Sequence, residues 1–208
     1  KEGHDEGLAT YFREHLRLEI EEILQDYTKP DGTPYNLYTD GLKIYTTINS
    51  RMQRYAEDAV REHMAKLQQD FYENWKNRKA PWNNEKILLE AKKRSPRYKA
   101  MQEQGYSIAA IDEAFATPVR MRVFDWEKGE VEREMSPMDS LRYYLSILQT
   151  GFIAMEPNTG LIRAWVGGID HQFFQYDHVK ARRQVGSTFK PIVYAAALEN
   201  GMLPCEYT

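Results

Sequence analysis

The sequence has few features that could tie a small protein together covalently or through a metal. It contains a single cysteine in 208 residues, Cys205, which cannot form an internal disulfide and is expected to be a free thiol. The five histidines are not spaced like the ligands of a metal site, so we expect neither a metal nor a cofactor. The fold should therefore depend on a hydrophobic core.

Long hydrophobic runs and an excess of one charge are missing as well. No apolar stretch approaches the roughly 20 residues that span a bilayer, and no signal sequence opens the chain, so we expect this piece to be soluble. The net charge is -3 without a basic block, which argues against nucleic acid as a partner. Hydrophobic residues make up 42% of the chain, enough for one domain or two small ones.

Hydrophobic periodicity predicts three elements in the first part of the chain. Residues 8–27 have apolar side chains every three or four positions, which is typical of an amphipathic helix. Alternation over 42–48 predicts a half-buried strand. A long apolar stripe over 50–75 predicts a helix that opens with a capping box of Ser50 and Gln53.

The middle of the chain is more polar and carries no recognisable chemistry. Three short helices are predicted. The first covers 87–94 and is broken at Ser95-Pro96, the second runs from this break up to 105, and the third covers 107–116. The basic run between 92 and 99 is interpreted as a solvated face. A hairpin over 119–135 is expected to pair arginines with glutamates across its strands: Arg120, Arg122, Glu132 and Glu134.

A helix capped by Ser136 is then expected to end at 150–151. Residues 152–155 and 161–166 are short, nearly continuous apolar segments, which favours central strands of a sheet covered by helices. The aromatic loop 170–178 could line the floor of a substrate cleft or pack on the sheet, and we favour packing.

The most informative stretch combines a serine, a lysine and a proline at the start of an apolar helix. Pro191 is tolerated only in the first helical turn, which places Ser187 near the N-cap, where free N–H groups and the helix dipole stabilise negative charge. Lys190 follows three residues later on the same face. Apolar neighbours should desolvate its amine and favour the uncharged form, which makes Lys190 a candidate general base for a nucleophilic Ser187.

A bare Ser-x-x-Lys is a weak signal, because two fixed residues occur by chance about once in a chain of this length. The alternative interpretation is that Ser187 only caps the helix and Lys190 is a solvated charge. The context strengthens the functional interpretation: an Arg-Gln-x-Gly turn precedes the pair, Phe and Pro close it, and it occurs only once in the sequence.

The string from Arg183 to Pro191 resembles the Arg-Gln-Pro-Gly-Ser-Thr-Phe-Lys-Pro motif of class A, bifunctional penicillin-binding proteins, with Val185 in place of a proline. Residues 41–49, Gly-Leu-Lys-Ile-Tyr-Thr-Thr-Ile-Asn, are similar to the entry of the transpeptidase half of that family. Residues 11–17 are similar to the segment that leads out of its glycosyltransferase domain. By resemblance, Ser187 is the acylated nucleophile and Lys190 its base.

The resemblance implies an incomplete α+β chain. It predicts a helical connector after a missing glycosyltransferase domain (1–40), then a linker or pedestal region of helices with a small antiparallel sheet (41–150). The first strands and the Ser-x-x-Lys helix of a transpeptidase-like, serine β-lactamase-like domain would follow (151–208). The second and third family motifs are not in the sequence, so we expect this polypeptide alone to be inactive.

The implied activity is that of a serine-type D-Ala-D-Ala transpeptidase that cross-links peptidoglycan. The implied partners are peptidoglycan stem peptides, β-lactam antibiotics and other cell-wall synthesis proteins, and the implied location is the periplasmic side of a bacterial membrane, with an anchor in the full-length protein. Two alternatives stay open: a carboxypeptidase, β-lactamase or β-lactam sensor with the same motif, and a non-enzymatic pedestal that binds a partner.

Overall fold

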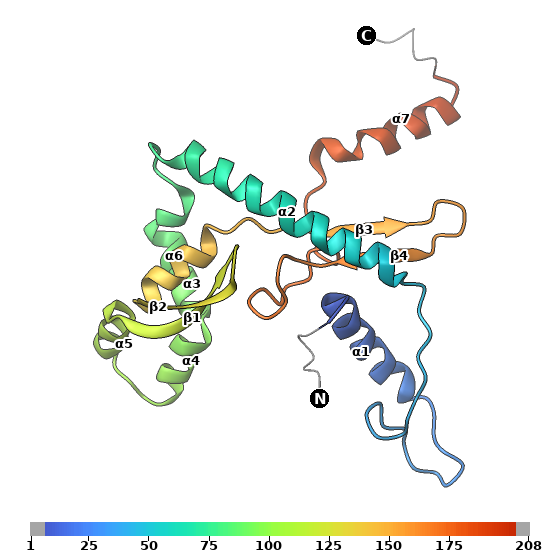
Figure 1. Ribbon diagram of the computed structural model, residues 1–208, viewed down its shortest axis with the longest axis horizontal. Coiled ribbons are helices and arrows are strands. Elements are labelled where there is room, and N and C mark those ends of the chain that lie inside the picture. The colour runs from blue at the N-terminus through green and yellow to red at the C-terminus, as the bar shows by residue number, and fades with distance from the viewer. Residues whose placement is uncertain (1–6, 203–208) are drawn as a thin grey trace.

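The computed structural model describes residues 7–202 and combines seven α-helices with two small antiparallel sheets in this range (Figure 1). This architecture confirms the predicted α+β class. The expectation for Cys205 lies outside the described residues. In chain order the elements are α1 (Thr10–Leu24), α2 (Ser50–Trp75), η1 (Pro81–Asn83), α3 (Glu85–Arg94), α4 (Pro96–Glu103), α5 (Ile108–Ala116), β1 (Val119–Asp125), β2 (Gly129–Met135), α6 (Pro137–Leu145), β3 (Phe152–Met155), β4 (Ile162–Val166), η2 (Gly186–Phe189) and α7 (Lys190–Glu199).

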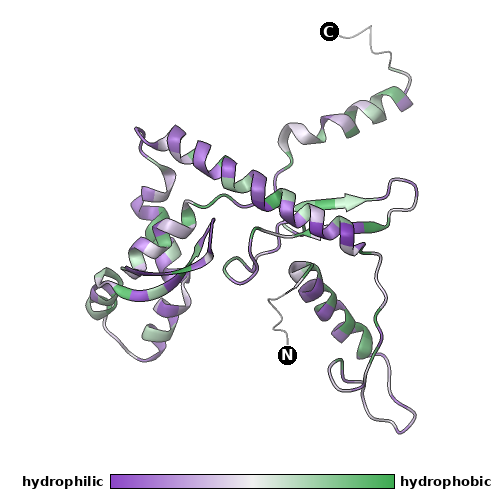
Figure 2. Cartoon of the chain, in the orientation of Figure 1, coloured by the Kyte–Doolittle hydropathy of each residue, from purple (hydrophilic) through white to green (hydrophobic). Residues whose placement is uncertain are grey.

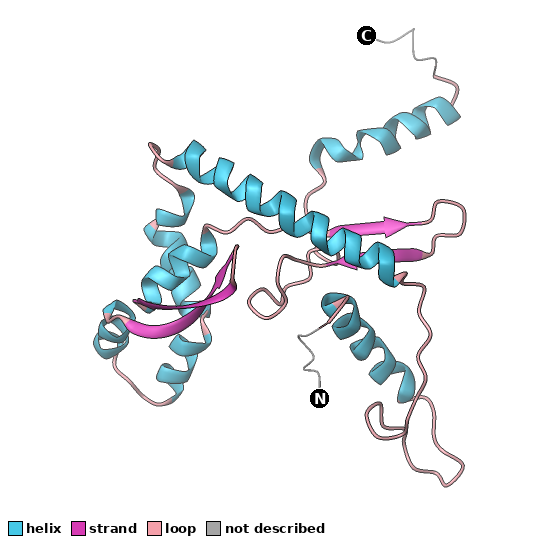
Figure 3. Ribbon diagram, in the orientation of Figure 1, coloured by secondary structure: helices cyan, strands magenta, loops and turns pink. Residues whose placement is uncertain are grey.

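The long helix α2 links the two sheets. It begins beside β4 and runs toward the group of elements from η1 to α6, which we call the pedestal (Figure 3). Its 26 residues span about 39 Å. The predicted capping box of Ser50 and Gln53 was wrong: the cap is Asn49, whose side-chain oxygen accepts from the N–H groups of Arg51 and Met52, both at 3.1 Å.

Two buried glutamines attach α2 to its neighbours. The Gln53 amide accepts from the Trp165 N–H at 2.7 Å and donates to the Trp165 carbonyl at 2.8 Å, so it pairs with β4 like a short strand. The Gln68 amide donates to the Ser146 carbonyl at 2.9 Å and accepts from the Leu148 N–H at 2.7 Å. The hydrophobic stripe did not predict these two contacts, because both residues are polar.

The pedestal follows its sequence pattern closely. Arg120 lies opposite Glu134 and Arg122 opposite Glu132, as predicted for the β1–β2 hairpin. Arg122 nevertheless forms its ion pair with Glu130, two residues along β2 from its opposite residue Glu132, at an N–O distance of 3.2 Å. Helices α3 to α5 lie close to their predicted positions, whereas α6 ends at Leu145, before the predicted end at 150–151.

One residue of the basic run departs from its predicted solvated position. Lys92 is only 4% exposed, forms an ion pair with Asp112 and lies over the Phe115 ring, 4.8 Å from its centroid. The aliphatic stem of a lysine can pack as a hydrophobic group while its ammonium finds a partner. Lys92 is therefore part of the pedestal core.

The strand predicted over 42–48 does not form. Residues 42–46 are irregular, and Tyr45 is 88% exposed. Only the end of the segment is attached to β4: the Thr47 hydroxyl donates to the Ile162 carbonyl at 2.7 Å, and the Asn49 N–H donates to the Arg163 carbonyl at 2.9 Å. Residues 42–48 alternate like a strand, but no neighbouring strand pairs with their backbone within the described residues.

The β3–β4 sheet also differs from the prediction of central strands. It has two strands, and β4 is buried beneath α2 while β3 is largely exposed. Figure 2 shows β3 as hydrophobic despite this exposure. Ala164 and Val166 pack with Ala56 of α2 in a small core cluster. One strand is therefore covered as predicted and the other is not.

The aromatic loop 170–178 packs, as we favoured. Phe173 and Phe174 contact the main core cluster, formed by Met64, Phe124, Ile147 and Ile169. This cluster joins α2, the hairpin and the loop after β4. No helix in the described part of the chain is long and apolar enough to cross a membrane.

Candidate active site

Ser187 lies in η2, a single 3₁₀ turn directly before α7. Gly186 opens this turn with φ +52°, a conformation that residues with a side chain rarely adopt. The Thr188 N–H and hydroxyl both donate to the Val185 carbonyl, at 3.2 and 2.5 Å. Pro191 lies in the first turn of α7, as predicted.

Ser187 and Lys190 are linked through the backbone. The Lys190 N–H donates to the Ser187 carbonyl, which is the hydrogen bond of a 3₁₀ turn. Side chains three residues apart nearly eclipse one another in such a turn, so the side chains of Ser187 and Lys190 leave the backbone on the same side. Both residues are exposed, and no hydrogen bond joins their side chains in the described structure. The catalytic roles of both stay predictions.

The alternative interpretation of Ser187 as a cap and the expected desolvation of Lys190 were both wrong. Ser187 does not cap α7: the N-cap is Phe189, without a side-chain cap bond, because the 3₁₀ turn comes between the serine and the helix. Lys190 is not desolvated by its neighbours, because they are exposed themselves; Ile192 is 60% and Val193 50% exposed. In Figure 1, α7 projects away from the other elements.

The loop that leads to Ser187 is attached to the end of β4. The two oxygens of Asp177 accept from the Trp165 indole N–H and the Val179 N–H, each at 2.9 Å. The His178 N–H donates to the Gly167 carbonyl at 2.7 Å. Burial, and then the positive charge of Arg183, lower the pKa of His178. The neutral imidazole is therefore favoured there.

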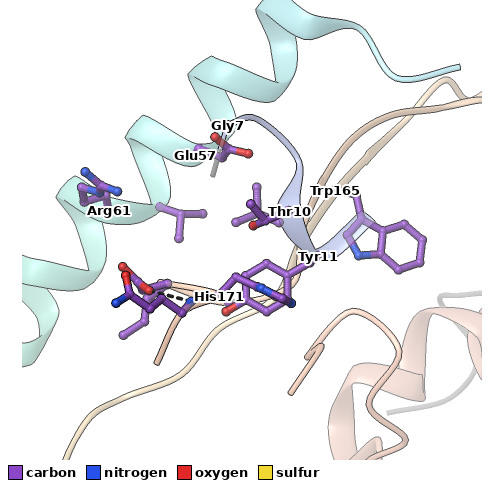
Figure 4. A pocket seen from close by; sticks show the side chains of 13 residues that line it. Gly7, Thr10, Tyr11, Glu57, Arg61, Trp165 and His171 are labelled. Atoms are coloured by element: carbon purple, nitrogen blue, oxygen red, sulfur yellow. Dashed lines mark hydrogen bonds between the residues drawn. The ribbon is translucent and has the colours of Figure 1, made fainter. Parts of the chain in front are cut away.

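A pocket of about 150 Å³ lies between α1, α2 and the loop after β4. Figure 4 shows Glu57 and Arg61 from α2 on one side, with Tyr11 and Trp165 on the other. Asp170 lines this pocket, and burial raises the pKa of its carboxyl. Hydrogen bonds from the Phe173 and Gln172 N–H groups, and then the charge of Arg61, oppose this shift. We assign no reaction to this pocket.

Tyr11 is the most enclosed side chain of α1. Its ring meets the edge of the His171 ring, with centroids 4.9 Å apart, and its hydroxyl donates to the Phe174 carbonyl at 2.5 Å. Burial and then the nearby Asp170 carboxylate raise its pKa, so the hydroxyl stays protonated. The sequence pattern did not single out this residue. The Gly167-Gly168 pair after an apolar strand is a signal for such a close contact.

Two family models match the chain. The penicillin-binding protein middle domain matches residues 72–148, and the penicillin-binding protein transpeptidase domain matches residues 150–207. Together they cover well over half of the sequence, and they meet between the pedestal and β3. The chain belongs to the penicillin-binding protein family.

The curated relatives narrow this assignment to class A, as the resemblance predicted. Proteins called penicillin-binding protein 1A match from Rickettsia bellii (28% identical over 98% of this chain), Escherichia coli (27% over 79%) and Neisseria flavescens (26% over 93%). The chain spans 28%, 24% and 27% of these relatives, respectively. No solved structure matches the chain.

Proposed function

We propose that the protein that carries this chain is a serine-type D,D-transpeptidase that cross-links peptidoglycan, with Ser187 as its nucleophile. The observation that carries this proposal is the turn at 186–190, which places Ser187 and Lys190 one 3₁₀ turn apart at the start of an apolar helix. This turn lies within the residues that match the transpeptidase family model.

In the proposed reaction, the uncharged Lys190 amine accepts the proton of the Ser187 hydroxyl as the oxygen attacks the carbonyl of a D-Ala-D-Ala stem peptide. The tetrahedral intermediate collapses and expels D-alanine, whose nitrogen takes up the proton that Lys190 accepted. An amine of a neighbouring stem peptide then attacks the acyl-enzyme and forms the new amide bond, the bond to Ser187 breaks, and the proton that the amine loses passes to the Ser187 oxygen. A β-lactam would acylate the same oxygen.

This chemistry requires an environment that favours an uncharged amine, and the described residues do not provide it around Lys190. We infer that further parts of a transpeptidase domain cover the exposed apolar residues of α7. Covering this helix would exclude water from Lys190 and lower the cost of removing its charge.

We propose that residues 1–40 form a connector to a glycosyltransferase domain, that 41–150 form a linker region that includes the pedestal, and that 151–208 begin the transpeptidase domain. Peptidoglycan stem peptides and β-lactams are the proposed ligands, with other cell-wall synthesis proteins as further partners. The longer protein is proposed to be anchored in the bacterial membrane, with this part on the periplasmic side.

Labelling with a fluorescent penicillin tests the nucleophile. The full-length protein is expected to form a covalent adduct that survives denaturation, and Ser187→Ala is expected to abolish it. Lys190→Ala should slow labelling by about 100-fold or more, because general-base catalysis contributes 10²–10⁴ in rate. The 208-residue polypeptide alone is expected to stay unlabelled.

Ser140→Ala is a matched control, because it removes a serine hydroxyl that bonds the Pro137 carbonyl in the pedestal, at 2.8 Å. It should label like the wild type. If the full-length wild type does not label, or if Ser187→Ala labels normally, the proposed nucleophile is wrong. The first result would favour a non-enzymatic pedestal module.

A further inference from the structure

Helix α1 holds the loop that delivers Ser187, although its residues lie more than 160 positions earlier in the chain. The loop leaves β4 at Gly167 and reaches η2 at Gly186. Three side chains on one side of α1 contact the end of β4 or this loop: Tyr11, Phe12 and His15.

The first contact is a close fit between Tyr11 and two glycines. A Cβ atom added to Gly167 would lie 2.7 Å from the Tyr11 ring, and one added to Gly168 would collide with its hydroxyl. Tyr11 is only 6% exposed. Because any side chain at 168 would displace the ring, the glycine pair forms a slot for Tyr11. From this slot the Tyr11 hydroxyl bonds the Phe174 carbonyl in the loop.

The second contact lies further along the loop. The His15 ring stacks on Trp165, with centroids 5.1 Å apart, and its Nδ1 is 2.9 Å from the Lys180 Nζ. The Trp165 indole bonds Asp177, which in turn bonds the Val179 N–H. The loop is therefore attached to α1 at 174 and 180 and to β4 at 177, and the His178 N–H bonds the carbonyl of Gly167, where the loop begins. Position 180 lies only seven residues before the serine.

We propose that Tyr11, seated in the Gly167-Gly168 slot, is a positioning residue for Ser187. Through the loop 170–180, α1 sets the place at which the chain enters η2, and so the orientation of the serine toward Lys190 and the scissile carbonyl. This inference rests on the proposed function. Misplacing a reacting group by about 1 Å can cost about 100-fold in rate.

The experiment measures acylation of the full-length protein by a fluorescent penicillin, with the rate constant of the covalent step separated from the dissociation constant of the initial complex. Tyr11→Ala and Gly168→Ala should each lower the covalent rate at least about tenfold and leave the dissociation constant within about twofold. Tyr11→Phe keeps the ring in its slot and should recover most of the rate.

Tyr98→Ala is the matched control, because it removes a half-buried tyrosine that packs against Phe115 in the pedestal. It should lower the melting temperature without slowing the covalent step. Hydrogen exchange supplies a second measurement that does not need activity: the amides of His178 and Val179 should exchange faster in Tyr11→Ala than in Tyr98→Ala.

The possible results separate this inference from the proposed function. A wild type that is not labelled refutes the function itself. A wild type that is labelled at the same rate as both Tyr11→Ala and Gly168→Ala overturns the positioning role, whether or not the loop amides exchange faster. Equal slowing in Tyr11→Ala and Tyr98→Ala also overturns it, because the effect would then be general loss of stability.

Discussion

The pedestal and α7 are both rich in apolar residues, but only the pedestal buries them. Leu88, Ile111, Phe115 and Val123 are each at most 4% exposed, whereas no residue of α7 is buried. In the pedestal, neighbouring helices and a hairpin lie close in the sequence and cover one another. A helix that is apolar on all sides indicates that a cover is needed, but its own sequence does not say where that cover comes from.

Truncating one apolar residue in each region should give the largest difference between the pedestal and α7. Phe115→Ala is expected to lower the free energy of unfolding by about 3–5 kcal/mol, because it leaves a cavity in a closed core. Ile192→Ala should change it by less than about 0.5 kcal/mol in this chain, because the side chain is 60% exposed. Urea denaturation of the 208-residue polypeptide measures both values. Similar losses would mean that α7 is packed in solution.

The two buried glutamines give α2 the fixed attachments that α7 does not have in the described structure. Gln53 attaches α2 to the β3–β4 sheet, and Gln68 attaches it to the end of the pedestal. Replacing either with leucine leaves one backbone N–H and one carbonyl without a partner, and should cost about 2–3 kcal/mol. The exposed Gln69→Leu is the matched control, with less than about 0.5 kcal/mol expected. Denaturation curves that do not distinguish Gln68→Leu from Gln69→Leu would contradict this.

Removing the partner of the buried Lys92 should destabilise the pedestal more than removing the charge of Lys92 itself. Asp112→Ala leaves the Lys92 charge without its partner and should cost about 2 kcal/mol, less than for a fully buried pair because Asp112 is 62% exposed. Lys92→Met keeps the apolar stem and should cost less than about 1 kcal/mol. Calorimetry of both variants, beside the exposed Lys93→Met, checks the order. A larger loss for Lys92→Met than for Asp112→Ala would reverse our interpretation.

The smallest expected effect concerns the cap of α6. A hydrogen bond from the Ser136 hydroxyl at 2.6 Å, and then Arg142, hold the pKa of Asp139 below its ordinary value of 3.8. Because the folded pKa is lowered, this contribution is present above pH 3.8 and is lost as the pH falls through the lower, folded value. Asp139→Asn should therefore cost less than about 1 kcal/mol at pH 7 and progressively less as the pH falls below 3.8.

A comparable site outside the pedestal is Glu156 in the β3–β4 turn, whose pKa is lowered by the Thr159 hydroxyl and then by Arg163. Glu156→Gln should show the same loss of effect in acid. Melting temperatures measured from pH 2 to 7 compare the two sites. A cost of Asp139→Asn that does not shrink as the pH falls would show that the carboxylate charge is not the cause.

The sequence predicted best where local pattern and tertiary partner coincide. The β1–β2 register, the helices of the pedestal and the start of α7 near Pro191 follow from alternation, caps and proline chemistry. The position of Ser187 was predicted to within one turn, because Pro191 is confined to the first turn of the helix. Its catalytic role is a prediction from resemblance.

The sequence predicted poorly where a distant partner decides. Residues 42–48 have a strand pattern but no strand beside them over most of their length. Gln53, Gln68 and Lys92 are polar residues in buried positions, and their burial depends on backbone groups or carboxylates far along the chain. Tyr11 fits a slot made by two glycines more than 150 residues away, which helical periodicity cannot indicate.

The glutamine pair of α2 has a consequence for insertions and deletions. Gln53 and Gln68 are 15 residues apart, or about 22 Å along the axis. Adding one residue between them would rotate one amide by about 100° around the helix and detach it from its backbone partner. Adding seven would rotate it by only about 20°. We therefore expect members of this family to differ in the length of α2 by seven residues, or two turns, at a time. Each such insertion would move the pedestal about 10 Å further from the β3–β4 sheet along the helix axis.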